Sequence, residues 1–472
     1  TMSATKNAVT GAVPKQGPVI TDWRPEDSHF WAAGGKAIAT RNLWISIPAL
    51  LLAFAVWMVW STVIVRLNSI GFTFSTDQLF WLAALPGLSG ATLRIFYSFM
   101  VPIFGGRRWT ALSTASLLAP ALWMGFAVQD PSTSYNVFVL IALLCGFGGG
   151  NFASSMSNIS FFYPKAQQGT ALGMNAGLGN LGVSVMQFGV PLVISVGIFG
   201  ALGGAPQNLP DGSQLWLQNA GFIWVPFILA VTLAAWFGMN DLTSAKASFS
   251  EQAVIFKRKH NWLMCWLYLA TFGSFIGFAA GLPMLIKTQF PGVDPLKFAF
   301  LGPLVGALIR PVGGWLADKM GGAQVTLWNF VVMIAAVFGV LHFLPQAGSE
   351  GNFYGFLAMF MLLFVTTGVG NGSTFRMIPV IFRTQHERLS AGKSKEEQEQ
   401  AGKNAGKEAA AVLGFSSAMA AYGAFFIPKS FGTSMALTGG PQMALYAFVG
   451  FYVSCIVLTW WSYARKGAEM PC

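Results

Sequence analysis

Charged residues are scarce in this chain, and their scarcity excludes most classes of protein. Only 10% of the 472 residues are Asp, Glu, Lys or Arg, whereas a soluble domain carries about 25%. The four cysteines and four histidines show no CxxC or Cys/His spacing, which argues against a disulfide framework or a metal site. The first forty residues contain Pro, Asp and Glu without an apolar core, which is not the pattern of a signal peptide. The composition predicts a membrane protein without a metal or cofactor.

Long apolar runs take the place of charge. Windows of about 19 or more apolar residues can cross a bilayer as helices. We predict twelve spans, numbered in chain order, at residues 43–65, 78–104, 109–128, 134–162, 168–196, 220–239, 261–286, 296–317, 325–344, 353–382, 409–430 and 442–463. The expected organisation is an all-α membrane protein with a segment at 1–42, a first bundle at 43–239, a polar loop at 240–260, a second bundle at 261–464 and a tail at 465–472.

The basic residues indicate the orientation in the membrane. The termini and the loops after the even-numbered spans hold 21 of the 28 Lys and Arg, the other side holds four, and three lie inside spans. This bias predicts that both termini are cytoplasmic. Because these residues flank apolar segments, the net charge of +11 does not indicate nucleic acid. The largest polar pieces, at 240–260 and a predicted Lys/Glu-rich loop at 383–408, are too short for an enzyme domain.

The two groups of six spans repeat one another. Arg94 is followed eleven residues later by a Gly-Gly pair, and so is Arg310. Asn151 and Asn371 likewise each precede a Phe by eleven residues. Parallel repeats of this kind relate two halves about an axis along the membrane normal, with a site at their interface near the midplane.

Arg94 and Arg310 each lie in the middle of a membrane-length apolar stretch. A guanidinium stays protonated in proteins, so each holds a permanent charge near the midplane at a cost of at least ~2.5 kcal/mol. No Asp or Glu falls inside any of the apolar stretches. A transported anion is therefore the simplest counter-charge. The alternative is that the arginines snorkel or bond backbone carbonyls, which their depth and repeat equivalence disfavour.

Several motifs resemble known transporters. GGWLADKMGG at 313–322 resembles the loop motif between helices 8 and 9 of the major facilitator superfamily, and FGGRRW at 104–109 is a degenerate first-half copy without the Asp. The longer segments NFASSMSNISFFYPK, ALGMNAGLGNLGVSVMQ and YLATFGSFIGF resemble the nitrate/nitrite porter family, of NarK type. The similarity covers nearly the whole chain. It implies a major facilitator fold of two pseudo-twofold-related six-helix bundles and transport of nitrate and nitrite.

The resemblance also implies a substrate site. Arg94 and Arg310 would grip a planar oxyanion from opposite sides with paired N–H groups. The matching aromatics Phe152 and Phe272 would flank the flat anion, and Tyr268, one helical turn before Phe272, would donate a hydrogen bond to it. For the two Phe, ordinary packing is the alternative in a chain with 42 Phe. The predicted substrate-binding set is completed by Asn151 and Asn180.

Spans 5 and 11 carry small residues that let helices approach closely. We expect their glycines to serve packing and sliding between helices; these are Gly173, Gly177, Gly179, Gly414 and Gly423. The family pattern has Gly-Gly where this chain has Ala176-Gly177, which bears on the tightness of contact. Asp318 of the loop motif is expected to act as a gate or helix cap. Arg376, six residues from the end of its span, is expected to snorkel, with an anion-guiding role in a vestibule as the alternative.

Three functions remain open at this stage. An exchanger of nitrate for nitrite is favoured, because closing an empty site would bury two like charges. A proton-coupled nitrate symporter needs a titratable group in its cavity, and the 17 acidic residues lie in loops or at span ends. A channel lined by positive charge fits the six-plus-six repeat less well. We expect a monomer in the bacterial inner membrane that binds no nucleic acid.

Overall fold

The computed structural model describes residues 17–244 and 252–472. Residues 1–16 of the predicted N-terminal segment and 245–251 of the predicted central loop lie outside the described residues. Twelve helical segments in the described residues are long and apolar enough to cross a membrane, as predicted from hydropathy. The chain is therefore an all-α, multi-pass membrane protein.

Each half contributes six spans, and several spans consist of two helices joined at a bend. The first half contains α2 (Ser28–Phe30), α3 (Lys36–Met58), α4 (Trp60–Leu67), α5 (Thr76–Tyr97), α6 (Met100–Phe104), α7 (Gly106–Ser116), α8 (Leu118–Ala127), α9 (Tyr135–Leu144), α10 (Gly146–Phe162), α11 (Lys165–Val193), α12 (Asn219–Phe222) and α13 (Trp224–Gly238). The second half contains α15 (Lys259–Tyr268), α16 (Ser274–Gln289), α17 (Leu301–Met320), α18 (Gly322–Phe343), α19 (Phe353–Leu389), α20 (Lys395–Ala421), α21 (Gly423–Thr438) and α22 (Gln442–Thr459). The π-helical turns η1 (Trp31–Gly35), η5 (Leu269–Gly273) and η7 (Trp460–Ala464) complete spans 1, 7 and 12.

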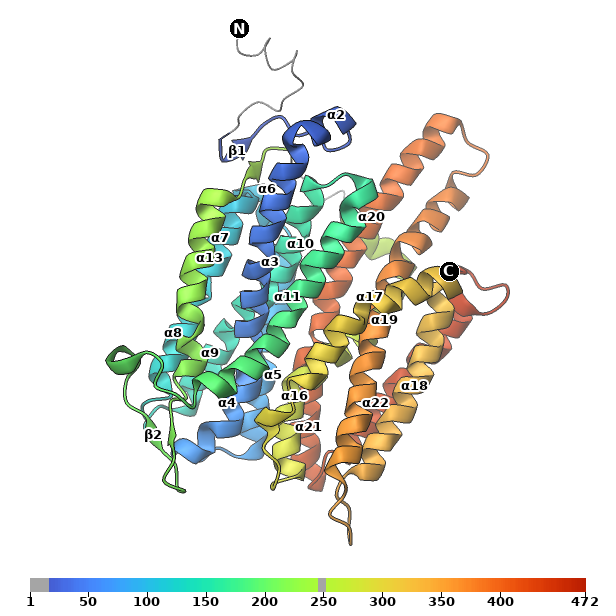
Figure 1. Ribbon diagram of the computed structural model, residues 1–472. Helices are drawn as coiled ribbons and strands as arrows, with labels where there is room; N and C mark the ends of the chain where they lie inside the picture. The colour runs from blue at the N-terminus through green and yellow to red at the C-terminus, as the bar shows by residue number, and fades with distance from the viewer. Residues whose placement is uncertain (1–16, 245–251) are drawn as a thin grey trace.

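The predicted loop at 383–408 is wrong. Helix α19 continues to Leu389, and α20 begins at Lys395 after a short turn. Figure 1 shows the two helices projecting beyond the rest of the bundle as a hairpin. Lys, Glu, Gln and Ala dominate this stretch and are strong helix formers, and the Ser394 side chain caps α20 by accepting from the Glu397 amide. A hydropathy window cannot detect a helix that is polar on all sides.

Several span boundaries also differ from the prediction; for example, span 11 ends at Thr438 instead of 430. Span 1 extends back to Ser28 instead of 43, because the Asp27 side chain caps a helix start there. Span 2 is interrupted near its end, where α5 stops at Tyr97 and α6 begins at Met100.

The two ends of the bundle differ in their secondary structure. The basic face, defined by the described N-terminal residues 17–27 and the loops after the even-numbered spans, carries a short parallel pair of β1 (Val19–Ile20) and β4 (Asp241–Leu242). The opposite face carries the antiparallel hairpin of β2 (Gln207–Asn208) and β3 (Gln214–Leu215). Figure 1 shows the two pairs at opposite ends of the first half.

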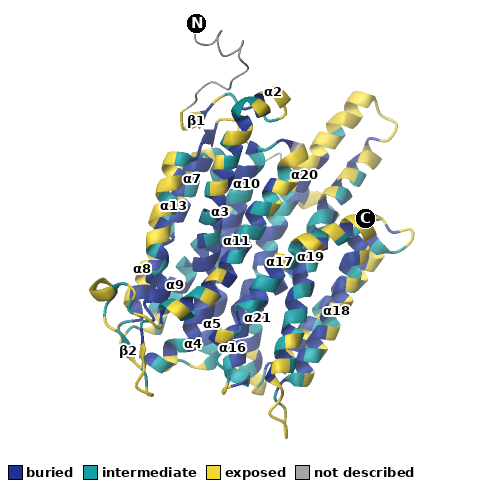
Figure 2. Cartoon of the chain, viewed as in Figure 1, coloured by how far each residue is buried: buried dark blue, intermediate teal, exposed yellow. Residues whose placement is uncertain are grey.

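Burial identifies the helices that line the centre. In the most apolar windows of spans 1 and 7, 89% and 94% of the residues are buried inside the protein, against 33% in spans 6 and 12. Figure 2 shows this difference as dark blue along α3 and exposed yellow along α13. Spans 1 and 7 are therefore central, and spans 6 and 12 face the lipid.

Candidate substrate site

Arg94 is enclosed at the interface between the halves. Its side chain comes from α5, and the residue is 1% exposed. Its Nε donates to the Gly149 carbonyl at 2.7 Å, and its Nη1 donates across the interface to the Ser417 carbonyl at 3.0 Å. The alternative of backbone bonding is thus realised for part of this guanidinium. It leaves Nη2 buried without a hydrogen-bond partner in the part of the chain that the structure describes.

Aromatic rings surround the same guanidinium. Its Cζ lies 4.7 Å from the ring centroid of Phe152, 5.0 Å from Trp57 and 5.4 Å from Phe272. The quadrupole of each ring stabilises the positive charge. Trp57 is held in place because its Nε1 donates to the Pro86 carbonyl at 2.7 Å.

Arg310 is held within its own half and is less enclosed. Its Nη2 donates to the Tyr268 hydroxyl at 3.0 Å, and its Cζ lies 4.8 Å from the ring centroid of Phe375. Like Nη2 of Arg94, its Nη1 is buried and has no hydrogen-bond partner within residues 17–244 and 252–472. Each arginine therefore directs one unsatisfied N–H-bearing nitrogen into the protein interior, an arrangement that is costly unless an acceptor meets it.

Tyr268 and Phe272 connect the two arginines. Their rings stack with centroids 5.5 Å apart and an interplanar angle of 18°. Tyr268 bonds Arg310 at one end of the pair, and Phe272 lies beside Arg94 at the other. The two arginines also influence each other electrostatically. The π-helical turn η5 begins directly after Tyr268 and includes Phe272, and such turns are frequent at functional sites. The structure thus brings together the five predicted residues Arg94, Arg310, Tyr268, Phe152 and Phe272.

The two predicted asparagines lie differently. Asn151 borders a small polar cavity of about 10 Å³ inside the first half, which it shares with Thr110 and Ser154. Asn180 of α11 is 1% exposed. The side-chain oxygen of each is buried without a hydrogen-bond partner among the described residues. Because the oxygen and nitrogen of an amide are assigned from hydrogen bonding, either group can present N–H donors after a flip.

The predicted glycines fall into two groups. A Cβ at Gly179 would lie 2.6 Å from Leu50, and one at Gly423 would collide with the backbone of Gly273. At Gly173, Gly177 and Gly414 an added Cβ would meet no atom of the described residues within 4 Å. Only the first group packs closely in the conformation seen here.

Several partners of the arginines were not predicted from the sequence. Trp57 and Phe375 contact the guanidinium groups, and the Gly149 and Ser417 carbonyls accept from Arg94. Backbone acceptors carry no sequence signal. The rings are hidden among the many aromatics of the chain, although Trp57 lies in span 1, which the apolar pattern alone could have marked as central.

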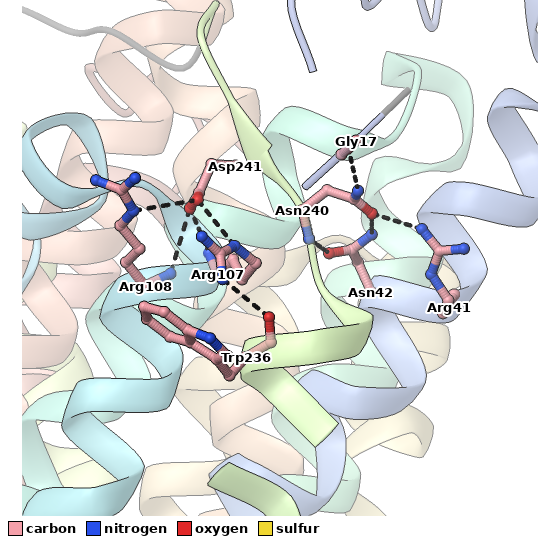
Figure 3. Close-up of polar contacts among 8 residues, drawn as sticks. All are labelled: Gly17, Arg41, Asn42, Arg107, Arg108, Trp236, Asn240 and Asp241. Carbon is pink, nitrogen blue, oxygen red and sulfur yellow. Dashed lines mark hydrogen bonds and ion pairs between the residues drawn. The ribbon is translucent and has the colours of Figure 1, made fainter. Parts of the chain in front are cut away.

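The first-half loop motif has no Asp of its own, but a carboxylate from a distant segment contacts it. The Asp241 carboxylate, just after α13, accepts from the backbone N–H groups of Arg107 and Arg108 at 2.8 and 3.3 Å and from Arg107 Nε at 3.1 Å. Figure 3 shows this cluster beside Trp236. Gly105 precedes it with φ 88°, ψ 151°, a conformation that favours glycine.

The second-half loop motif has the same backbone and different partners. Gly321 has φ 86°, ψ 134°. At the start of the helix that follows, Ala323 N donates to the backbone oxygen of Cys472 at 3.0 Å. Asp318 instead accepts from Arg376 Nε at 3.0 Å. Arg376 thus links α19 to the end of α17.

The polar contacts that join the halves lie on one side of the molecule. Between the opposite face and the midplane they are Arg66–Asp294 (2.8 Å), Lys429–Asp77 (3.5 Å), Lys287 to the Val65 carbonyl (2.6 Å), Gln187 to the Ala279 carbonyl (2.9 Å), Thr92–Tyr422 (2.9 Å) and Arg94 to the Ser417 carbonyl (3.0 Å). Among the described residues, no hydrogen bond or ion pair joins the halves nearer to the basic face than Arg94. The halves are therefore fastened together at the opposite face.

Comparison with known proteins agrees with this architecture. The model of the major facilitator superfamily matches residues 45–391. A crystal structure of a bacterial homologue of the human lysosomal transporter Spinster superposes with a TM-score of 0.58 at 13% identity, over 90% of this chain and 96% of that one. The chain belongs to the major facilitator superfamily, and its fold and homologues are those of transporters, not enzymes.

Similar proteins of named function show to which family within the superfamily the chain belongs. The nitrate/nitrite transporters NarU of Salmonella typhimurium and Escherichia coli are 59% and 57% identical, each over 95% of this chain and 96% of the relative. The probable nitrate/nitrite antiporter NarK2 of Thermus thermophilus is 44% identical over 97% of this chain and 99% of its own length. Within the superfamily, this chain is a member of the nitrate/nitrite porter family that its motifs indicated.

Proposed function

We propose that this protein exchanges nitrate for nitrite across the bacterial inner membrane, with the anion held between Arg94 and Arg310. The observation that carries the proposal is a pair of buried guanidinium nitrogens, one on each arginine, that have no hydrogen-bond partner among the described residues. A planar oxyanion offers several acceptors in one plane and suits two guanidinium groups that approach it from different sides. The names of the relatives, which include nitrate/nitrite transporters and a probable antiporter, support these substrates.

The aromatic rings fit a flat anion. Phe152 and Phe272 both lie beside Arg94, so an anion that reached Nη2 would lie near their faces. Tyr268 gives its hydroxyl oxygen to Arg310, which leaves its O–H hydrogen to donate to the substrate. Asn180, after an amide flip, would add a further N–H donor.

Alternating access would follow from the way the halves are fastened. The polar contacts between the described residues of the two halves lie from the midplane to the opposite face, whereas Gly173, Gly177 and Gly414 have no described atom close to them. The Lys/Arg bias predicts that the basic face is cytoplasmic, so this conformation corresponds to an inward-facing state. If the halves closed at the basic face, Gly173, Gly177 and Gly414 would come against neighbouring helices.

Exchange follows from electrostatics. Two permanent positive charges that already repel each other would have to be occluded together if the empty carrier crossed, and burying an unpaired ion costs several kcal/mol. Each 1.4 kcal/mol of extra barrier slows a step about tenfold. An anion in the site removes most of this cost, so the occupied forms interconvert faster than the empty one.

The test is counterflow in proteoliposomes. Vesicles that contain the purified protein are loaded with nitrite or with buffer alone, and labelled nitrate is followed with and without an imposed inward proton gradient. We expect nitrite inside the vesicles to accelerate nitrate entry and the gradient to change it little.

Vesicles that contain the Arg310→Lys variant provide the control for leakage, since this variant keeps the charge and loses the planar fork. Strong gradient-driven accumulation in nitrite-free vesicles would overturn exchange in favour of proton symport. Equal rates in the variant would remove the arginine site from the mechanism.

A further inference from the structure

A groove lies at the end of span 1 where the chain enters the bundle from the basic face. Its volume is about 620 Å³. Small residues form much of its lining, namely Ala32, Ala33, Gly34 and Ala37. Gly34 has φ 156° and ψ −15° within the turn η1, a conformation that favours glycine. The groove is thus shaped by the backbone of the bend between α2 and α3.

Two cations, Lys36 and Arg41, line the groove, and its lining contains no Asp or Glu among the residues that the structure describes. Lys36 is exposed and makes no hydrogen bond or ion pair with the residues that the structure describes. The local charge is therefore positive and available to an anion.

Arg41 is held in place by groups behind the groove. Its Nε donates to the Gly238 carbonyl at 2.8 Å, and its Nη2 donates to Asn240 Oδ1 at 2.7 Å. Asn42 fixes Asn240 in turn through hydrogen bonds of 2.8 and 2.9 Å, as Figure 3 shows. Only Nη1 of Arg41 has no partner among the described residues. Because the guanidinium is already oriented, little side-chain entropy remains to be lost when an anion binds.

The depth of the groove matches the boundary of the bilayer. The apolar stretch of span 1 begins at residue 43, directly after Arg41, and Trp44 lines the groove while 52% exposed. Tryptophan at such a position is typical of the membrane interface. Phe237 precedes Gly238, whose carbonyl accepts a hydrogen bond from Arg41, and it is 80% exposed. The cations thus lie at headgroup level with apolar side chains beside them.

We propose that this groove binds the phosphate headgroup of an anionic phospholipid from the leaflet at the basic face. The headgroup phosphate would meet Lys36 and Nη1 of Arg41, while the acyl chains cover Trp44 and Phe237. A zwitterionic lipid would bring its own cation towards the two positive side chains. A free phosphate ion would leave the two aromatic side chains uncovered.

The test is native mass spectrometry of the full-length protein in detergent, titrated with phosphatidylglycerol or phosphatidylcholine of identical acyl chains. We expect the wild type to bind phosphatidylglycerol more tightly. Removing one positive charge in Lys36→Gln weakens that binding about fivefold, whereas Lys36→Arg retains it. Lys297→Gln is the matched control, because Lys297 is also exposed without a partner among the described residues but lies towards the opposite face.

Because Arg41 also bonds span 6, the Lys36 variants carry the test, and an unchanged apparent Tm verifies their folding. Equal binding of the two lipids would overturn the proposal, as would identical binding by Lys36→Gln and Lys297→Gln. Complete displacement of phosphatidylglycerol by millimolar inorganic phosphate would mean that the groove takes free phosphate instead of lipid. None of these readouts depends on transport, so they are independent of the proposed exchange.

Discussion

The two halves contribute equivalent arginines that are held in different ways. Arg94 is almost fully buried, bonds one carbonyl in its own half and one in the other, and lies among three aromatic rings. Arg310 is partly exposed, and among the described residues it bonds only the Tyr268 hydroxyl of its own half. The two arginines therefore occupy equivalent positions in the repeat, but the hydrogen bonds and rings around Arg94 restrict its side chain more than those around Arg310.

The contrast assigns different tasks to the two side chains. The bond from Arg94 to the Ser417 carbonyl belongs to the conformation in which the halves meet at the opposite face, so it has to be remade or lost when they rock. Arg310 can follow its own half as a unit with Tyr268 and Phe375. Substitutions at matched positions in the two halves test this difference.

The largest effect is expected from Arg94→Lys and Arg310→Lys. Either change keeps the charge but removes the planar guanidinium, and losing the one charge-assisted hydrogen bond from its free nitrogen, worth about 1.5–3 kcal/mol, corresponds to about ten- to a hundredfold weaker nitrate binding. Titration calorimetry on purified variants measures this. Arg94→Lys should also lower the apparent Tm, because it loses two backbone carbonyl bonds, whereas Arg310→Lys should not.

Near-normal nitrate affinity in either lysine variant would mean that a point charge is sufficient. Equal Tm values for the two variants would contradict the separate structural role of Arg94.

The loop motifs provide the second comparison. Asp241 is 7% exposed and pairs with Arg107, whereas the side chain of Asp318 is 69% exposed. Breaking a buried pair costs about 3 kcal/mol or more, and an exposed pair is worth less than about 1 kcal/mol. Asp241→Asn should therefore lower the apparent Tm of the solubilised protein by several degrees, with Asp318→Asn as the matched control. Equal shifts would show that the Asp241 cluster is not a stabilising cap of α7.

Most of the fold was predictable from the sequence, because each span is a long apolar run and the repeat aligns the two halves. The polar hairpin of α19 and α20 was not, because its stability comes from helix propensity and a Ser394 cap. The clustering of Arg94, Arg310, Tyr268, Phe152 and Phe272 was anticipated from motif resemblance. The role of Asp241 was not, because its contact with Arg107 joins residues more than a hundred positions apart in the chain.

A third, smaller effect is expected from Tyr268→Phe. The ring and its stacking on Phe272 are retained, but Arg310 loses its hydroxyl partner and the substrate loses a donor. One hydrogen bond to a charged group is worth about 1.5 kcal/mol, or about tenfold in nitrate affinity. The control is Tyr422→Phe, which removes the hydrogen bond to Thr92 on the other side of the interface. If both variants bind nitrate equally well, the Tyr268 hydroxyl does not contribute to nitrate binding.

The smallest change in affinity, and the most informative about selectivity, is expected from Phe152→Ala and Phe272→Ala. Both rings lie beside Arg94, at 4.7 and 5.4 Å from its Cζ. A slot between two flat faces accepts a planar anion and rejects tetrahedral ones by shape, so opening it should admit competitors more than it weakens nitrate uptake. We expect inhibition of nitrate uptake by sulfate and other bulky anions to strengthen several-fold, while uptake itself changes by about twofold. Phe375→Ala, which removes the ring beside Arg310 instead, is the matched control in the other half. If it loosens selectivity as much as the other two, the slot is not specific to Arg94; if none of the three does, the rings only pack the helices together.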